Sequence, residues 1–100
     1  MKYTEEVIWQ VWAKASVIGA NDPTLWRKDE YGAWIFRSDY KNKDSEYGWV
    51  IDHIKEAPIE TNATSNLRPL HWLNSLKIID GGSKHRVTSD GTHNLFPKTT

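Results

Sequence analysis

The chain contains no cysteine, and this absence excludes two kinds of site. Without thiols the fold cannot depend on disulfide bonds, and a zinc site built on thiolates cannot form. The side-chain metal ligands to expect are therefore histidine, aspartate, glutamate and asparagine.

A long apolar run and an excess of one charge are also absent. No stretch approaches the roughly 20 apolar residues that cross a bilayer, and Glu5 and Glu6 lie where a secretory signal would be basic. We therefore expect a cytoplasmic protein with no membrane partner. The 13 basic and 13 acidic residues give zero net charge, so charge alone does not predict nucleic-acid binding. Residues 81–100 carry three basic and one acidic side chain, a small local excess of positive charge.

The apolar and aromatic content is sufficient for one folded domain. Hydrophobic residues make up 38% of the 100 residues, and six of them are tryptophans. Near the N-terminus apolar residues recur at helical spacing, with Thr4 before them as a cap and Gly19 after them as a stop. We predict a helix over residues 5–18 whose apolar face is formed by Val7, Ile8, Val11, Trp12, Ala15 and Ile18.

The following residues indicate short strands joined by polar segments. The segment "RKDEYG" (27–32) predicts an exposed turn, and aromatic and β-branched residues after it predict strands at 33–37, 47–52 and 66–72. Between the last two, residues 55–65 are polar and predict a loop.

The C-terminal third predicts one more helix and then little regular structure. Leu73, Leu76 and Ile79 fall on one helical face, so we expect a helix at about 72–79. Residues 81–100 are low in apolar content and predict a loosely structured extension, with a hairpin around Asp90-Gly91. The expected architecture is α+β, with one domain over residues 1–80.

Asp52 and His53 stand side by side at the end of the apolar strand "GWVIDHI". Neighbouring residues on a strand point to opposite faces, so these two side chains can converge only where the strand ends. A carboxylate can bind a hard cation such as Mg²⁺, and a neutral imidazole beside it can take a proton from water. By itself such a pair is more often a turn residue followed by a hydrogen-bonded histidine.

The surrounding motifs resemble those of a family. The stretches "VWAKA", "WRKDEYGAWIFRSDY", "DSEYGWVIDHI" and "NLRPLHWLNSLK" are similar to a group of small bacterial HNH endonucleases, over roughly residues 8 to 77. The resemblance implies a ββα-metal core at about residues 47–79 behind an N-terminal helix. It implies metal-dependent hydrolysis of DNA phosphodiester bonds, with Mg²⁺ as the expected metal and Mn²⁺ as the alternative.

The resemblance also implies a role for each residue that matches the family pattern. His53 would be the general base, and Asn66 would bond loop backbone and fix the orientation of His53. Asp52 and Asn74 would hold the metal. The residues expected to face nucleic acid are Lys77, His71 and Arg68.

Several of these residues also have a simpler structural interpretation. Asn66 can merely open a strand, Lys77 can be a solvated helix residue, and His71 beside Trp72 can be a packed structural histidine. Asn74 can face solvent, or it can be out of register with the family's ligand position, in which case Ser75 takes that place.

Two further departures weaken the family's chemistry without affecting its fold. Leu76 stands near the family's usual arginine, which removes a phosphate contact, and Val50 replaces the glutamate usual before the Asp-His pair. Two functions from different classes therefore remain open. One is an active endonuclease; the other is a catalytically weakened HNH-like module that binds a protein partner or nucleic acid as a regulator or inhibitor.

Overall fold

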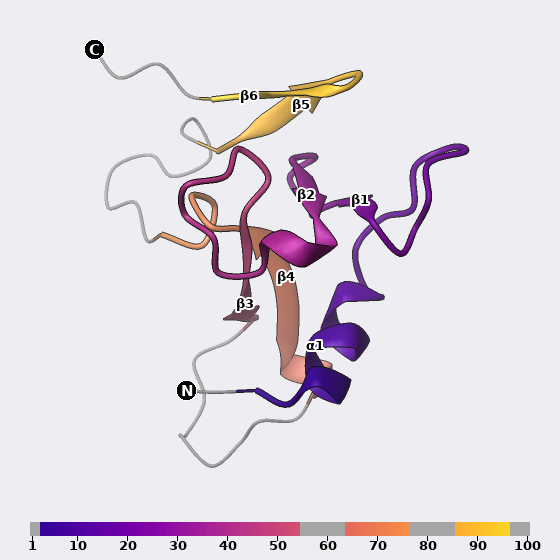
Figure 1. Ribbon diagram of the computed structural model, residues 1–100. Coiled ribbons are helices and arrows are strands. Elements are labelled where there is room, and N and C mark those ends of the chain that lie inside the picture. The colour runs from indigo at the N-terminus through magenta and orange to yellow at the C-terminus, as the bar shows by residue number, and fades with distance from the viewer. Residues whose placement is uncertain (1–2, 55–63, 77–85, 97–100) are drawn as a thin grey trace.

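The computed structural model describes residues 3–54, 64–76 and 86–96, and in these the chain is a mixed α+β protein (Figure 1). The described elements are one α-helix, two short 3₁₀ turns and three antiparallel strand pairs. In chain order they are α1 (Glu5–Trp12), β1 (Trp26–Lys28), β2 (Trp34–Phe36), η1 (Arg37–Asp39), β3 (Trp49–His53), η2 (Thr64–Asn66), β4 (Leu67–His71), β5 (Thr88–Asp90) and β6 (His93–Leu95). The pairs are β1 with β2, β3 with β4, and β5 with β6.

Helix α1 begins as the sequence predicts but ends six residues earlier. The Thr4 hydroxyl accepts a hydrogen bond from the Val7 amide at 3.2 Å, which confirms the cap. At the other end Arg27 donates to the carbonyls of Ala13 and Ala15, and Ser16 pairs with Lys28. Partners from a distant segment thus take the carbonyls that a longer helix would need. The predicted end at residue 18 is therefore wrong.

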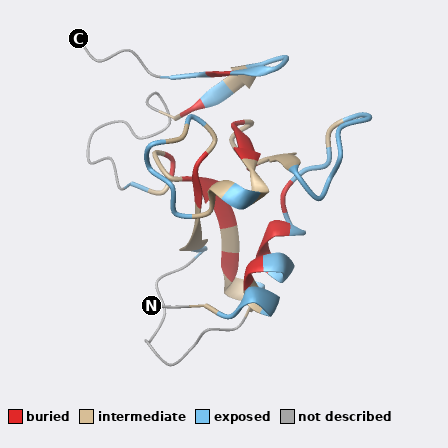
Figure 2. Cartoon of the chain, in the orientation of Figure 1, coloured by how far each residue is buried: buried red, intermediate tan, exposed pale blue. Residues whose placement is uncertain are grey.

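The buried face of α1 packs against the β3–β4 pair (Figure 2). Ile8, Val11 and Trp12 are buried, as their helical spacing predicts. The rings of Trp12 and Trp49 lie 5.2 Å apart at a tilt of 46°, an arrangement in which aromatic pairs attract each other beyond their burial. The core is completed by Ala15, Ile35 and Leu67.

Gly48 explains why a glycine precedes Trp49 in the "GWVIDHI" stretch. A side chain at this position would collide with the backbone carbonyl of Asn42. The Gly48 carbonyl also accepts a hydrogen bond from the Trp72 amide at 3.1 Å. Close packing of backbone on both sides therefore requires glycine here, and it fixes where β3 starts.

The segment "RKDEYG" is not the exposed turn that the sequence predicts. Arg27 and Lys28 belong to β1, and Asp29 is buried with 3% of its surface exposed. The turn that follows is real, and Gly32 occupies it with φ of 90°, a conformation that suits glycine. The sequence predicts exposure because Asp29 is charged. Asp29 is buried because hydrogen-bond donors from elsewhere in the chain bind its carboxylate.

The β5–β6 hairpin forms around Asp90-Gly91, as predicted, but it is not loosely attached. Val87 is fully buried, and Asn94 is 7% exposed. The Asn94 side chain accepts from the Trp34 amide at 2.6 Å and donates to the Trp34 carbonyl at 3.0 Å. Residues 86–96 are thereby bonded to β2, so the expectation of a loose extension does not describe them.

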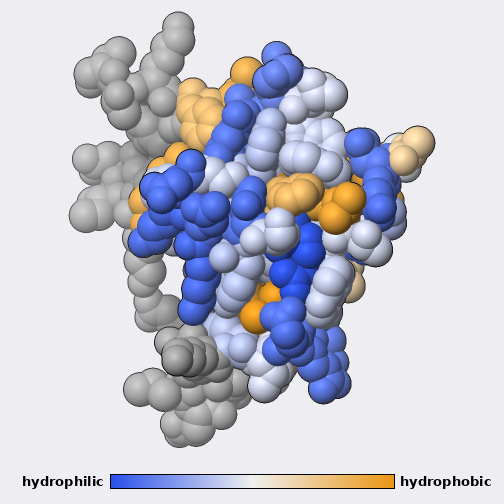
Figure 3. Space-filling model, in the orientation of Figure 1, coloured by the Kyte–Doolittle hydropathy of each residue, from blue (hydrophilic) through white to orange (hydrophobic). Residues whose placement is uncertain are grey.

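The helix expected at about 72–79 is not seen where the chain is described. Residues 72–76 form successive turns, in which the amides of Asn74 and Ser75 both bond the His71 carbonyl. Residues 77–79 lie outside the described residues. No described helix is long and apolar enough to cross a membrane. The face in Figure 3 is mainly hydrophilic, with hydrophobic side chains in small separate areas.

Candidate functional site

The β3–β4 pair brings the Asp52–His53 end of one strand beside the start of the other. In the antiparallel register Asp52 lies opposite Arg68 and His53 lies opposite Leu67. Strand β3 ends at His53, and the Ile54 amide then donates to the Asn66 carbonyl at 2.8 Å. The strand pair therefore closes next to His53, and its last backbone bond is made by Asn66.

Asp52 and His53 line the same depression, as expected for two neighbours at a strand end. Its volume is about 220 Å³, and we refer to it as the strand-end depression. It is lined by Asp52, His53, Ile54, Arg68, Asn74, Ser75, Leu76 and Arg86. Three chain segments that are distant in sequence contribute to it, and together they supply a carboxylate, an imidazole and two guanidinium groups.

His53 is an exposed residue of this depression. Within the described chain its ring makes no hydrogen bond and no ion pair. An imidazole with unengaged nitrogens can accept a proton from water or bind a ligand. The position is therefore compatible with the role of general base that the resemblance implies.

Asp52 is held by Arg68. The Oδ2 atom of Asp52 accepts from Arg68 Nε at 3.1 Å and from Nη2 at 3.0 Å, while Arg68 Nη1 binds Glu30 at 3.0 Å. Arg68 thus sits between two carboxylates, and its charge is compensated inside the protein. Because both donors bind Oδ2, this oxygen is engaged by Arg68, and a metal ion would have to bind Asp52 through Oδ1. The predicted nucleic-acid contact of Arg68 stays a prediction.

Asn66 belongs to the short turn η2 just before β4. Lys14 reaches this turn from beyond the end of α1, and its ammonium group donates to the carbonyls of Thr64 and, at 2.7 Å, Leu67. These bonds tie both sides of Asn66 to the helical segment. The role that the resemblance assigns to Asn66, bonding loop backbone and orienting His53, stays a prediction.

The Asn74 side chain points into the core, and 1% of the residue is exposed. Its Oδ1 accepts from the Val87 amide at 2.6 Å, and its Nδ2 donates to Asp29 at 2.9 Å and to the Val87 carbonyl at 3.1 Å. Both ends of the amide are therefore engaged within the protein. Its role as a metal ligand stays a prediction, and these contacts do not favour it.

Ser75 and Lys77 complete the predicted ligand region. The Ser75 hydroxyl donates to the Trp72 carbonyl at 2.8 Å, and Ser75 lines the strand-end depression. Its oxygen keeps lone pairs for a weak or water-mediated contact. Lys77 lies outside the described residues.

His71 is fully buried, and both of its ring nitrogens are used. Nε2 lies 2.7 Å from the Glu46 carbonyl, and Nδ1 accepts from the Leu73 amide at 3.1 Å. This pattern fixes a neutral ring with the proton on Nε2. Burial lowers the pKa of His71 below its ordinary value, although the Glu46 carbonyl opposes that shift. The contacts are those of a packed structural histidine.

The lowered pKa of His71 predicts acid sensitivity of the fold. The unfolded chain takes up a proton at about pH 6.5, whereas the folded chain does so only at lower pH. The contribution of His71 to the free energy of unfolding is therefore highest above pH 6.5. As the pH falls from 6.5 to the pKa of the folded chain, the free energy of unfolding decreases by at most about 1.4 kcal/mol per pH unit. Urea unfolding at pH 7.5, 6.5 and 5.5, with the His71 ring titrated by NMR, checks this. A ring that titrates at or above pH 6.5 would contradict it.

The described residues fit a metal ion only in part. No three histidine, aspartate or glutamate side chains come together in residues 3–54, 64–76 and 86–96 in a way that could hold one. Of the two ligands that the resemblance implies, Asp52 keeps its Oδ1 without a hydrogen bond from described residues, whereas Asn74 is engaged. Mg²⁺ in phosphate enzymes commonly takes one carboxylate, substrate oxygens and water. Asp52 suits such a site, and Asn74 does not.

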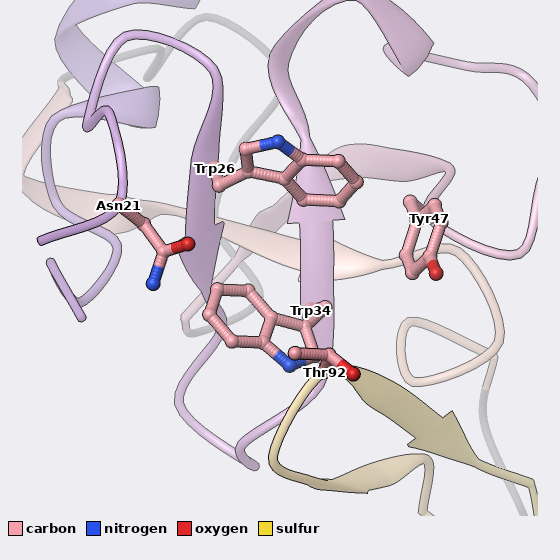
Figure 4. Close-up of a pocket in the computed structure, with 5 residues that line it drawn as sticks. All are labelled: Asn21, Trp26, Trp34, Tyr47 and Thr92. Carbon is pink, nitrogen blue, oxygen red and sulfur yellow. The ribbon is translucent and has the colours of Figure 1, made fainter. Parts of the chain in front are cut away.

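A second cavity is aromatic (Figure 4). Its volume is about 210 Å³, and it is lined by Asn21, Trp26, Trp34, Tyr47 and Thr92. The Trp26 ring is nearly perpendicular to those of Trp34 and Tyr47, with angles of 88° and 86°. The Trp34 indole donates to the Gly91 carbonyl at 2.5 Å. This cluster joins β1 and β2 to the hairpin, and none of its lining side chains is an imidazole or a carboxylate.

Comparison with known proteins does not add to the site. No family model, curated protein or solved structure matches this chain. The likeness to HNH endonucleases therefore stays a prediction from the sequence motifs.

Sequence reasoning missed two residues of this region. Asp29 accepts hydrogen bonds that hold the end of β4 and Asn74, and Arg86 lines the strand-end depression. The sequence offered only a weak signal for Arg86, namely the small positive excess of residues 81–100. For Asp29 there was none, because a charged residue in a polar stretch predicts exposure.

Proposed function

We propose that this protein is a metal-dependent endonuclease of the HNH type that hydrolyses phosphodiester bonds of DNA. The observation that carries the proposal is His53, exposed and without a hydrogen-bond partner among the described residues, beside the Asp52 carboxylate in a depression that two arginines also line. In this proposal β3 and β4 are the two strands of a ββα-metal core, and the motifs around them supply the family expectation.

The proposed reaction uses His53 as the general base. Its ring takes a proton from a water molecule, and the water oxygen forms a bond to phosphorus. The bond from phosphorus to the leaving sugar oxygen breaks, and that oxygen takes a proton from solvent water. Cationic side chains in the depression stabilise the charge that develops on the phosphate oxygens. Arg68 holds Oδ2 of the Asp52 carboxylate, which neighbours His53.

A divalent metal would be held by Asp52 through the oxygen that Arg68 leaves unbonded. Mg²⁺, or Mn²⁺ in its place, would neutralise charge on the scissile phosphate. Where the structure describes the chain, this one carboxylate is the strong ligand that the protein offers, and the metal would depend on the substrate for its remaining ligands. Metal binding without DNA should therefore be weak.

The test is nicking of a supercoiled plasmid by purified protein with Mg²⁺, Mn²⁺ or EDTA, with Asp52→Asn as the matched variant. We expect nicking with either metal, none with EDTA, and a loss of at least about 10-fold in the variant, since a neutral amide is a weaker ligand and no longer attracts the cation. Metal-independent nicking, or nicking that Asp52→Asn leaves unchanged, would contradict the proposal.

A second candidate is the binding module, and two features favour it. Arg68 already supplies a cation to Asp52. The rim of the same depression also carries two exposed hydrophobic residues, Ile54 and Leu76, at 48% and 49% exposure. A protein partner could cover such a rim. Absence of nicking with every metal, by protein of confirmed fold, would select this candidate over the nuclease.

A further inference from the structure

Arg86 reaches the strand-end depression from the C-terminal hairpin segment. Its Nη1 donates to the Asn74 carbonyl, and its guanidinium lies 4.6 Å from the centre of the Tyr31 ring. Asn74 and Tyr31 belong to two separate turns of the chain, and both contact the planar guanidinium. The guanidinium is therefore a fixed part of the depression that contains Asp52 and His53.

Among the described residues, the charge of Arg86 is not compensated in the way that the charge of Arg68 is. Arg68 pairs with both Asp52 and Glu30, whereas no carboxylate of the described residues lies within 4.0 Å of Arg86. The Nε atom of Arg86 is buried and has no hydrogen-bond partner there. A partly buried guanidinium without a counter-charge is costly, so an anion in the depression would be stabilised by it.

The chemistry of the depression selects the anion. Planar guanidinium groups bind phosphate oxygens strongly, and the acceptor would lie beside the His53 imidazole. The side chain of Leu76, on the same rim, has no hydrogen-bond donor and cannot bind an anion, whereas Arg86 can. Building on the proposed nucleic-acid substrate, we propose that Arg86 binds a backbone phosphate of that substrate and that the C-terminal hairpin thereby belongs to the site.

Arg37 provides a matched control. It also stacks on an aromatic ring, that of Trp9, at 4.1 Å, and its Nε is also buried and unpartnered within the described chain. Unlike Arg86, it pairs with Glu5 and does not line the strand-end depression. A loss that follows only from removing a stacked arginine would appear equally in both variants.

The experiment measures binding without cleavage. A fluorescein-labelled DNA duplex is titrated in EDTA, by anisotropy, at several salt concentrations with wild type, Arg86→Gln, Arg86→Lys and Arg37→Gln. We expect Arg86→Gln to weaken binding about 10-fold and to reduce the slope of log K against log salt by about 1, the value for one phosphate contact. Arg86→Lys should keep most of the slope, and Arg37→Gln should bind within about twofold of wild type.

Three results would overturn the proposal. They are an unchanged salt slope in folded Arg86→Gln, an equal loss in Arg37→Gln, and no DNA binding by the wild type. Thermal melting of each variant establishes that the molecules compared are folded. DNA binding that depends on Arg86, without nicking in Mg²⁺, would support this inference and rule out the nuclease. Nicking by the wild type, with an unchanged salt slope in Arg86→Gln, would support the nuclease and rule out this inference.

Discussion

We expect Asp29→Ala to lower the free energy of unfolding by about 4 kcal/mol, the size of effect seen when a buried charged network is broken. The Asp29 carboxylate accepts four hydrogen bonds. Oδ1 takes those from the amides of Tyr31 and Ala33 at 3.0 and 2.9 Å, and Oδ2 takes those from the His71 amide and Asn74 Nδ2 at 3.0 and 2.9 Å. Alanine would leave these donors buried without an acceptor.

The loss should be large because Asp29 joins three parts of the chain. Its own turn leads into β2, His71 ends β4, and Asn74 continues the contact to Val87 before the hairpin. A typical domain has only about 5–15 kcal/mol of stability, so the variant would be close to unfolding. Asp29 is therefore predicted to hold the strand-end depression together without being part of its chemistry.

Urea unfolding followed by tryptophan fluorescence measures this effect. Asp29→Asn keeps one acceptor oxygen and should lie between wild type and Asp29→Ala. Asp44→Ala removes an exposed carboxylate and should change the free energy of unfolding by less than about 0.5 kcal/mol. A value for Asp29→Ala within about 1 kcal/mol of wild type would mean that the four hydrogen bonds do not form in solution.

We expect His53→Ala to reduce nicking by about 10² to 10⁴, the usual contribution of a general base. The same change should leave stability nearly unaltered, because the side chain is exposed and makes no hydrogen bond within the described chain. Loss of activity and retention of fold would then be separated in one variant. A structural histidine such as His71 would not give this combination.

His93→Ala is the matched control, since His93 is also exposed but lies on β6 and does not line the strand-end depression. It should nick plasmid at the wild-type rate. Rates for wild type and His53→Ala are compared in Mg²⁺ with protein of equal melting temperature. Equal rates would remove His53 as the base, and an equal loss in His93→Ala would point to a general effect of histidine removal.

The parts of the fold that could be predicted depend on neighbouring residues. Thr4 caps a helix whose buried face follows from spacing, and Asp90-Gly91 turns a hairpin because glycine accepts the required positive φ of 63°. The position of Asp52 and His53 at a strand end followed from the apolar residues before them. Each of these depends on interactions within a few residues.

The candidate site was predicted only in outline. Asp52 and His53 were singled out, and the structure places both at one depression. The ion pair between Asp52 and Arg68 depends on the register in which β3 and β4 pair, and this register is a tertiary feature. Asn74 had three readings from sequence, and its contacts with Asp29 and Val87 belong to none of them.

The sequence by itself determined the helix start, the strands around the Asp-His pair, and the two side chains on which the proposed chemistry depends. Tertiary structure alone decided where α1 stops, which charges are compensated and which side chains surround His53. The physical reason is that a charged group has no fixed preference for burial or exposure until its partners are placed. Asp29 is buried by donors up to 45 positions away along the chain, and Arg86 comes to His53 through the fold.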